Sequence, residues 1–227
     1  MPASTAERAT EGTLDPAGIR ALVIAGWAGR DAARVEAHVR ELEAEGIPRP
    51  PRTPMFYRLS AGLLTTDSEI TVIGGSTSGE VECLLVSRND GLWVGLASDH
   101  TDRALERTSV AKSKQVCLKP AARALWRFDD VAPHWDQLEL RSFINADGKQ
   151  TPYQSGTAAA MLPPDSLLKD LASRGGAFEA GTAMFCGTLA TLSAIRASSR
   201  FEMELHDPVL KRTIRHAYSV HDLPESL

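Results

Sequence analysis

Two glutamates and an aspartate give this 227-residue sequence its first candidate site. Glu80 and Glu82 stand in SGEVECLLV, and residues two apart in a strand point to the same face. Asp99 follows the next apolar run, where that strand would finish. Carboxylate oxygens are the ligands that Mg²⁺ and Mn²⁺ prefer, so the three residues could hold a hard divalent cation. The alternatives are paired glutamates exposed on an edge strand and an aspartate that only forms a turn.

His38 and Glu41 form a second candidate pair. They lie three residues apart in HVRELEAE, which places them on one face if the segment is helical. A carboxylate beside an imidazole fixes its tautomer and raises its basicity, so the pair could act as a general base that activates water. A solvated, charged helix face is the alternative. The HxxE spacing differs from the HExxH of zinc proteases and excludes that class.

Other polar residues could bind a substrate. Lys112 and Lys114 alternate with small residues in VAKSKQV and could present an ammonium group, with solvated lysines as the alternative. Gly187 and Thr188 end an apolar run and could hold a carboxylate, although a β-turn explains them equally well. His100 directly follows the candidate aspartate, and we predict a surface residue because adjacent side chains at a strand end point in opposite directions. The sequence contains no nucleotide-binding glycine loop and no GxSxG motif.

Apolar spacing and chain breakers predict the elements that position these residues. ALVIAG at 21–26 predicts a buried strand, and Asp31 predicts the N-cap of a helix that runs to about Glu45. Gly46 ends that helix, and the prolines between 48 and 54 make a strap. Many strands and few helices indicate a β-rich α+β fold. Further strands are predicted at 55–59, 69–73, 80–87, 92–97, 138–144, 183–187, 200–206 and 212–220, and helices at 119–126 and 164–173.

Composition excludes several classes of protein. The formal net charge is −4, which argues against binding to nucleic acid or to an anionic membrane. No apolar run reaches the roughly 20 residues of a membrane helix, and the polar N-terminus does not resemble a secretory signal. Cys83, Cys117 and Cys186 are odd in number and show no metal-binding spacing. This pattern predicts that the three cysteines are reduced thiols in a cytoplasmic protein.

The order of these features resembles the fumarylacetoacetate hydrolase (FAH) superfamily over about residues 20–220. MFYRLSAGLLTTDSEI resembles its Phe-Leu-Lys and Ser-Ala-Leu segment, and GEVECLLV its Glu-x-Glu pair. SDHTDRALE resembles its Asn-Asp-x-Ser/Thr-x-Arg-Asp stretch, and GTAMFCGT its Thr-Gly-Thr strand. The nearest branch is an uncharacterised bacterial one, known only as a domain of unknown function.

The resemblance implies a fold and a division of the chain. The fold is a mixed β-sandwich roll or barrel with an N-terminal strand and a lid helix. Residues 1–18 would form a flexible N-terminus, 19–54 the strand, lid helix and proline strap, and 55–227 the β-rich catalytic domain. The resemblance also implies a homodimer.

Individual residues receive roles from the same resemblance. Glu80, Glu82 and Asp99 match the three carboxylates that hold Mg²⁺ or Mn²⁺. His38 and Glu41 match the pair on the lid helix that activates water. The positions that match substrate-binding residues are Arg103, Lys114 (or Lys112 in the alternative register), Gly187 and Thr188.

Departures from the superfamily pattern leave the substrate open. Glu106 stands where many members have Gln, which alters the polar group that the pocket accepts. Arg58 replaces a Lys, while Ser98 and Ala104 replace an Asn and an Asp. Arg30, just before the lid helix, is a further residue that could face the site.

The resemblance implies a metal-dependent hydrolase that cleaves a C–C bond in a small 2-oxo or β-dicarbonyl carboxylic acid of the acylpyruvate kind. The resemblance implies that the substrate chelates the metal, that the metal stabilises an enolate leaving group, and that His38 deprotonates the attacking water. Decarboxylases, hydratases and isomerases of related 2-oxo acids share the architecture and are alternatives. A non-catalytic dicarboxylate-binding or degenerate homologue is the alternative of another class. The expected partner is a small anionic 2-oxo acid.

Overall fold

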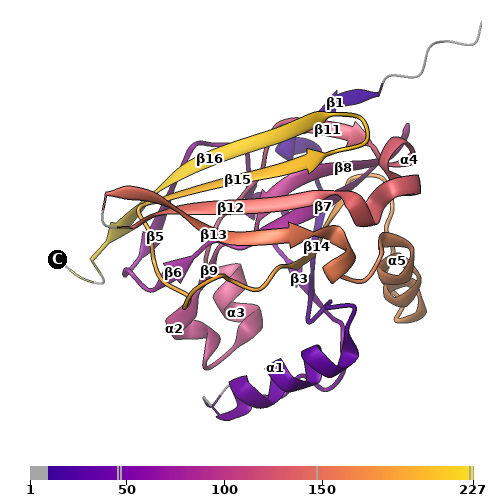
Figure 1. The fold of residues 1–227 in the computed structure, drawn as a ribbon. Helices are drawn as coiled ribbons and strands as arrows, with labels where there is room; N and C mark the ends of the chain where they lie inside the picture. The colour runs from indigo at the N-terminus through magenta and orange to yellow at the C-terminus, as the bar shows by residue number, and fades with distance from the viewer. Residues whose placement is uncertain (1–9, 45, 47, 147, 225, 227) are drawn as a thin grey trace, which may run out of the picture.

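The computed structural model describes residues 10–44, 46, 48–146, 148–224 and 226. Two sheets pack against each other, and short helices lie beside the larger one (Figure 1). This arrangement confirms the predicted β-rich α+β class. Every strand that the sequence predicts is present, with ends that differ by a few residues at most.

The larger sheet has seven strands and is buried on both faces. In β7, Cys83 and Leu85 face the second sheet, while Leu84 and Val86 pack on the opposite side with Leu14 and its neighbours. Burial on both faces explains why this strand reads as a continuous apolar run rather than an alternating one. The strand order is β1 (Glu11–Thr13), β11 (Ala124–Arg127), β8 (Gly91–Ser98), β7 (Val81–Arg88), β14 (Thr182–Thr188), β2 (Ala21–Gly26) and β3 (Met55–Leu59).

The second sheet has five strands and covers one face of the first. In β15 the apolar residues Phe201, Met203 and Leu205 point into the shared core, and the residues between them are partly exposed. This period of two is the pattern of a sheet with one buried face. The strand order is β13 (Lys149–Thr157), β12 (Glu139–Ala146), β15 (Arg200–Asp207), β16 (Arg212–Leu223) and β5 (Glu69–Ile73).

Short elements complete the described chain. Two small sheets pair β10 (Lys119–Pro120) with β4 (Leu64–Thr65), and β6 (Thr77–Ser78) with β9 (Thr101–Asp102). The α-helices are α1 (Ala32–Ala44), α2 (Arg103–Glu106), α3 (Val110–Gln115), α4 (Phe128–Val131) and α5 (Pro164–Ser173). The 3-10 helices are η1 (Pro16–Gly18), η2 (Ala61–Leu63), η3 (Ala132–Gln137) and η4 (Ala158–Ala160). None of the helices in the described ranges has the length and apolarity needed to cross a membrane.

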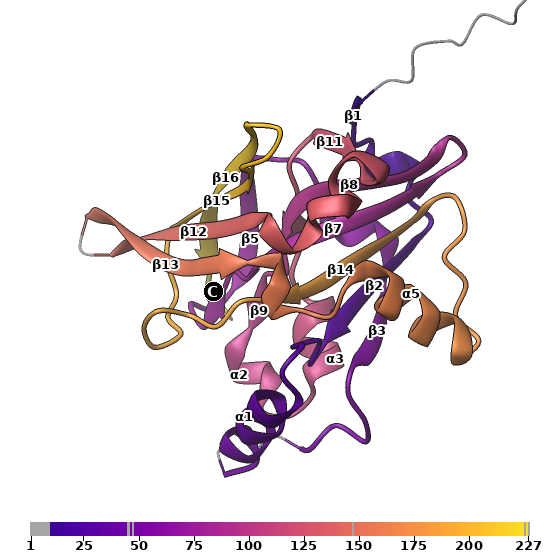
Figure 2. The same cartoon turned by 45° about the vertical axis from the view of Figure 1, so that its right-hand side comes forward.

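Helix α1 projects from the body of the fold (Figure 2). Asp31 caps it as predicted, because its Oδ1 accepts the N–H groups of Ala33 and Arg34 at 3.0 and 3.2 Å. Val39 is its one buried residue. Arg49 of the proline strap binds Glu36 through both terminal nitrogens, at 2.9 and 3.0 Å, so the strap is tied to the helix.

The predicted helix at 119–126 is wrong. Lys119 and Pro120 pair with β4, and Ala124 to Arg127 form β11. Leu125 and Trp126 are buried there, so packing between strands overrides the helix propensity of an alanine-rich segment. The long strand β13 and the short helices α2 and α3 were not predicted. Residues 1–9 of the expected flexible N-terminus lie outside the described residues, and the remainder of that segment includes β1 and η1.

Candidate metal centre and active site

The three candidate metal ligands meet at one end of the β7–β8 pair. One oxygen from each of Glu80, Glu82 and Asp99 lies within 4.8 Å of the others, and we call these residues the carboxylate triad. Strand register explains the meeting, because Glu82 pairs with Ala97 and the chain then returns beside Glu80. The Asp99 N–H donates to the Glu80 carbonyl at 2.9 Å. Glu82 and Asp99 are buried and Glu80 is partly buried.

Backbone of β14 holds Glu82. The Gly187 N–H donates to Glu82 Oε2 at 2.6 Å. Gly187 has a φ of +94°, and a Cβ on it would lie 3.0 Å from the Ala28 Cβ, so this close approach favours glycine. Burial raises the pKa of Glu82 well above its usual range, and the charges of Asp99 and Glu80 raise it further. A bound cation would therefore relieve a strong repulsion.

Two buried lysines flank Asp99. Lys114 Nζ pairs with Asp99 Oδ2 and lies 3.7 Å from Glu80 Oε2. Lys119 Nζ lies 3.2 Å from Asp99 Oδ1 and donates to the His100 carbonyl at 2.5 Å. Burial opposes ionisation of Asp99, but the two ammonium groups outweigh it and lower the pKa of the carboxyl group. Lys119 was missed by sequence reasoning, because one lysine before a proline carries no signal of burial.

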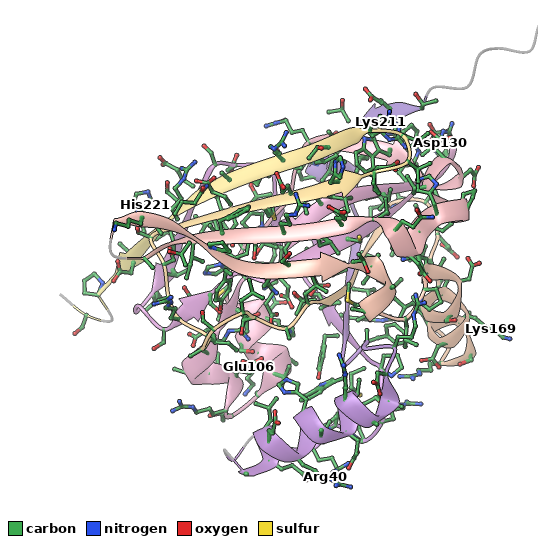
Figure 3. All side chains as sticks on the ribbon, viewed as in Figure 1. Arg40, Glu106, Asp130, Lys169, Lys211 and His221 are labelled. Atoms are coloured by element: carbon green, nitrogen blue, oxygen red, sulfur yellow. The ribbon has the colours of Figure 1, made fainter. Side chains whose placement is uncertain are left out.

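Arg103 connects the triad to a fourth carboxylate. Its Nε donates to Ser78 Oγ at 2.7 Å, its Nη1 donates to Glu106 Oε2 at 2.9 Å, and its Nη2 lies 3.1 Å from Glu80 Oε1. Glu106 projects from α2, below the two sheets in Figure 3. We call the seven charged residues joined in this way the charged cluster: Glu80, Glu82, Asp99, Arg103, Glu106, Lys114 and Lys119.

Helix caps place Arg103 and Lys114. The Asp102 side chain accepts the Leu105 N–H at 2.9 Å and starts α2, so Arg103 is its first residue. Ser109 accepts the Lys112 N–H at 3.3 Å and starts α3, on which Lys114 is buried. The two short helices lie side by side (Figure 1), and ion pairs of Arg103 and Lys114 join them to the triad. The capping residues thus direct both cations toward the carboxylates.

The donor set of the triad fits a hard cation. Three carboxylate oxygens at this separation suit Mg²⁺ or Mn²⁺, which prefer oxygen ligands. The nearest thiols do not compete as ligands, since burial raises the pKa of Cys83 and of Cys186 far above neutrality. The triad would hold the ion, and Lys114, Lys119 and Arg103 would set its surroundings.

Several predicted site residues lie outside the charged cluster. Lys112 and Arg58 are exposed. Arg30 binds both oxygens of Asp136 at 2.6 and 2.7 Å, so it fastens the start of α1 to η3. Thr188 Oγ1 donates to the Val81 carbonyl at 2.9 Å and accepts from the Gln154 amide at 2.7 Å. Of the two lysine registers, the structure brings only Lys114 to the triad.

His38 and Glu41 lie on the exposed side of α1. Nδ1 of His38 is 3.5 Å from Glu41 Oε2, and their side chains are 59% and 73% exposed. Neither makes a hydrogen bond or an ion pair with the charged cluster in the described chain. Trp27 links the helix to the sheet: its ring lies 5.8 Å from that of His38, and its Nε1–H donates to the Tyr57 hydroxyl at 3.1 Å.

The prediction that His100 is a surface residue is wrong. Its side chain is 1% exposed, and its ring nitrogens lie 2.9 Å from the Tyr218 hydroxyl and 2.9 Å from Thr77 Oγ1. The Tyr218 hydroxyl is also 2.8 Å from Ser98 Oγ. The argument from strand alternation failed because Asp99 and His100 lie between strands: β8 ends at Ser98, and β9 begins only at Thr101. Alternation of side chains does not hold in such a connection. This network supports the turn that carries Asp99.

Comparison with known proteins places the chain in a family. A family model described as a protein of unknown function (DUF2848) matches residues 25–218. No curated protein matches the sequence.

Solved structures show the same fold. Yeast ynq8, a fumarylacetoacetate hydrolase family protein, is 17% identical over 91% of this chain and 95% of its own, with a TM-score of 0.65. A putative HpcE protein from Mycobacterium smegmatis is 20% identical over 97% and 81% of the two chains, with a TM-score of 0.65. A 2-keto-3-deoxy-D-arabinonate dehydratase complexed with magnesium and 2,5-dioxopentanoate is 14% identical over 92% and 75%, with a TM-score of 0.64. The chain therefore belongs to the DUF2848 family and has the fold of the fumarylacetoacetate hydrolase proteins.

Proposed function

We propose that this protein is a Mg²⁺- or Mn²⁺-dependent enzyme that acts on small 2-oxo acids. The observation that carries the proposal is the carboxylate triad, with its oxygens within 4.8 Å of one another beside two buried lysines. The fold supports it, since a neighbour with this fold is complexed with magnesium and a small oxo acid. When bound, the ion supplies positive charge against the negative charge that develops on the substrate.

The finer proposal is hydrolysis of a C–C bond in a β-dicarbonyl carboxylic acid of the acylpyruvate kind. The resemblance gives Lys114 the substrate-binding role, and its ammonium group lies beside the triad, paired with Asp99 and 3.7 Å from Glu80 Oε2. His38 would take a proton from water at Nε2, while Glu41 beside Nδ1 fixes the ring. This role requires α1 to close over the charged cluster, with the proline strap as the hinge.

A lyase is the second candidate, namely a decarboxylase of a related 2-oxo acid. The observation that favours it is the exposed position of His38 and Glu41, since a decarboxylase needs no activated water. Turnover by a His38→Ala variant separates the two reactions. The proposed enzyme is a cytoplasmic homodimer, as the sequence and the family resemblance imply.

Thermal unfolding with added ligands tests the proposal. We compare the protein in EDTA, in Mg²⁺, and in Mg²⁺ with pyruvate, a three-carbon 2-oxo acid. A ligand at one hundred times its Kd should add about 2.7 kcal/mol to the free energy of unfolding. We expect a rise with Mg²⁺, a further rise with pyruvate, and neither in Glu80→Gln. Folded protein that responds to no divalent ion would contradict the proposal.

A further inference from the structure

In the fully ionised form that would bind a metal, the charges of the charged cluster do not balance. It contains four carboxylates and three cations, which leaves one negative charge in excess when all seven groups are ionised. These side chains are buried or nearly so, the most exposed being Glu106 at 19%. An uncompensated charge in such surroundings is costly. A bound divalent cation turns the excess into one positive charge, and a single carboxylate of a ligand would cancel it.

The cations of the cluster are already paired by the protein. Lys114 and Lys119 both pair with Asp99. Arg103 lies between Glu80 and Glu106, with each carboxylate about 3 Å from one of its terminal nitrogens. Glu106 therefore takes up the charge of Arg103 that a second carboxylate of a ligand would otherwise use.

We propose that Glu106 restricts this site to 2-oxo acids with one carboxylate and an uncharged remainder, and that it rejects 2-oxo dicarboxylates. Glu106 is a specificity-determining residue, since it sets the charge that the ligand must carry and leaves the metal ligands untouched. The inference rests on the proposed function and narrows its substrate class. Loss of the Glu106 charge would leave Arg103 with Glu80 as its one carboxylate partner in the cluster, and would leave the metal-loaded cluster with room for a second negative charge.

A pair of matched acids tests this inference. 2-Oxopentanoate and 2-oxoglutarate share a five-carbon chain and differ in the second carboxylate. Their Kd values are measured by calorimetry on Mg²⁺-loaded protein. We expect wild type to prefer 2-oxopentanoate, and Glu106→Gln to shift the ratio of the two affinities toward 2-oxoglutarate by about tenfold, the scale of one partly screened charge pair.

Two control variants isolate the charge at this position. Glu106→Asp keeps the charge and should keep the wild-type preference. Glu204→Gln removes a charge of similar burial, 16% exposed and paired with Arg141 and Arg215 on the second sheet, and should also leave the ratio unchanged. Thermal unfolding without ligand confirms that each variant is folded.

The outcomes separate this inference from the proposed function. Protein that shows no response to Mg²⁺ contradicts both. Protein that binds Mg²⁺ but neither acid overturns the inference, as does wild type that binds the two acids equally or prefers 2-oxoglutarate. An unchanged affinity ratio in Glu106→Gln overturns it while leaving the metal site in place.

Discussion

The charged cluster and helix α1 use the same kinds of residue in opposite surroundings. On α1 and its strap, Glu36, Arg40 and Arg49 form ion pairs at 2.9 to 3.0 Å that remain substantially exposed. In the cluster, Lys119 and Asp99 form an ion pair at 3.2 Å with both side chains fully buried. Water can replace a lost partner on α1 but not in the cluster. Burial, rather than the number or length of ion pairs, therefore decides what a charge contributes.

The sharpest test of this contrast is Asp99→Ala. It leaves Lys114 and Lys119 without their shared partner, so the free energy of unfolding should fall by about 3–5 kcal/mol. Urea unfolding in EDTA measures the change without a contribution from metal. Asp136→Ala is the control, since it breaks the exposed pair with Arg30 and should cost less than about 1 kcal/mol. Equal losses of unfolding free energy in Asp99→Ala and Asp136→Ala would contradict the proposed difference between buried and exposed ion pairs.

Tyr218→Phe tests the buried support behind the triad. It removes a hydroxyl that contacts both His100 Nδ1 and Ser98 Oγ, so the free energy of unfolding should fall by about 1–3 kcal/mol. Tyr57→Phe is the matched control, because within the described residues its partly buried hydroxyl has one hydrogen-bond partner, Trp27. We compare the urea concentrations at which the two variants and wild type are half unfolded. If Tyr218→Phe were the milder change, the network would have no role in supporting the turn.

His38→Ala separates function from stability on α1. The side chain is 59% exposed, so we expect the free energy of unfolding to change by less than about 0.5 kcal/mol. Turnover of an acid that wild type hydrolyses should be lost, while the Mg²⁺-induced thermal shift persists. Full turnover would remove His38 from the mechanism and favour the lyase.

Glu36→Gln should have the smallest effect. Hydrogen bonding from Arg49 lowers the pKa of Glu36 to about 2, and Arg40 adds to this. A carboxyl group with a lowered pKa in the folded state stabilises the fold above its unfolded pKa, and that contribution is lost as the pH falls toward about 2. The difference in Tm between wild type and variant should be slight at pH 7, disappear by pH 2, and disappear in 1 M salt. A difference that survives high salt would mean that this pair behaves like the cluster.

Local patterns were enough to predict the strands of the two large sheets except β1, β11 and β13, and to nominate Glu80, Glu82 and Asp99 as candidate metal ligands. Strands over 69–73 and 200–206 alternate apolar and polar residues, and β7 is a long apolar run. Each can therefore be recognised as a strand from a few consecutive residues. Glu80 and Glu82 were found because two residues is the repeat of a strand. The approach of Asp99 followed from one hairpin, in which β7 and β8 pair without a shift in register.

The remaining parts of the site depend on contacts between distant segments. His100 and Lys119 owe their burial to Tyr218, Thr77 and Asp99, and no pattern near either residue reveals those partners. Pro120 and the alanines that follow it favour a helix locally, yet they lie where β4 and β8 need strand partners. Gly187 was predicted to bind the substrate, whereas its N–H donates a hydrogen bond to the Glu82 side chain.

The hydrogen bond between Ser98 and Tyr218 bears on the order in which the protein folds. Its two residues are 120 positions apart, so during synthesis the turn that carries Asp99 is made long before its support on β16. Contacts of such long sequence separation form late, because the loop between them must close first. Strands β7 and β8 are neighbours in sequence and can pair early. Tight metal binding should arise only when β16 packs against the turn that carries Asp99. Acquisition of the metal would then report the last stage of folding rather than its beginning.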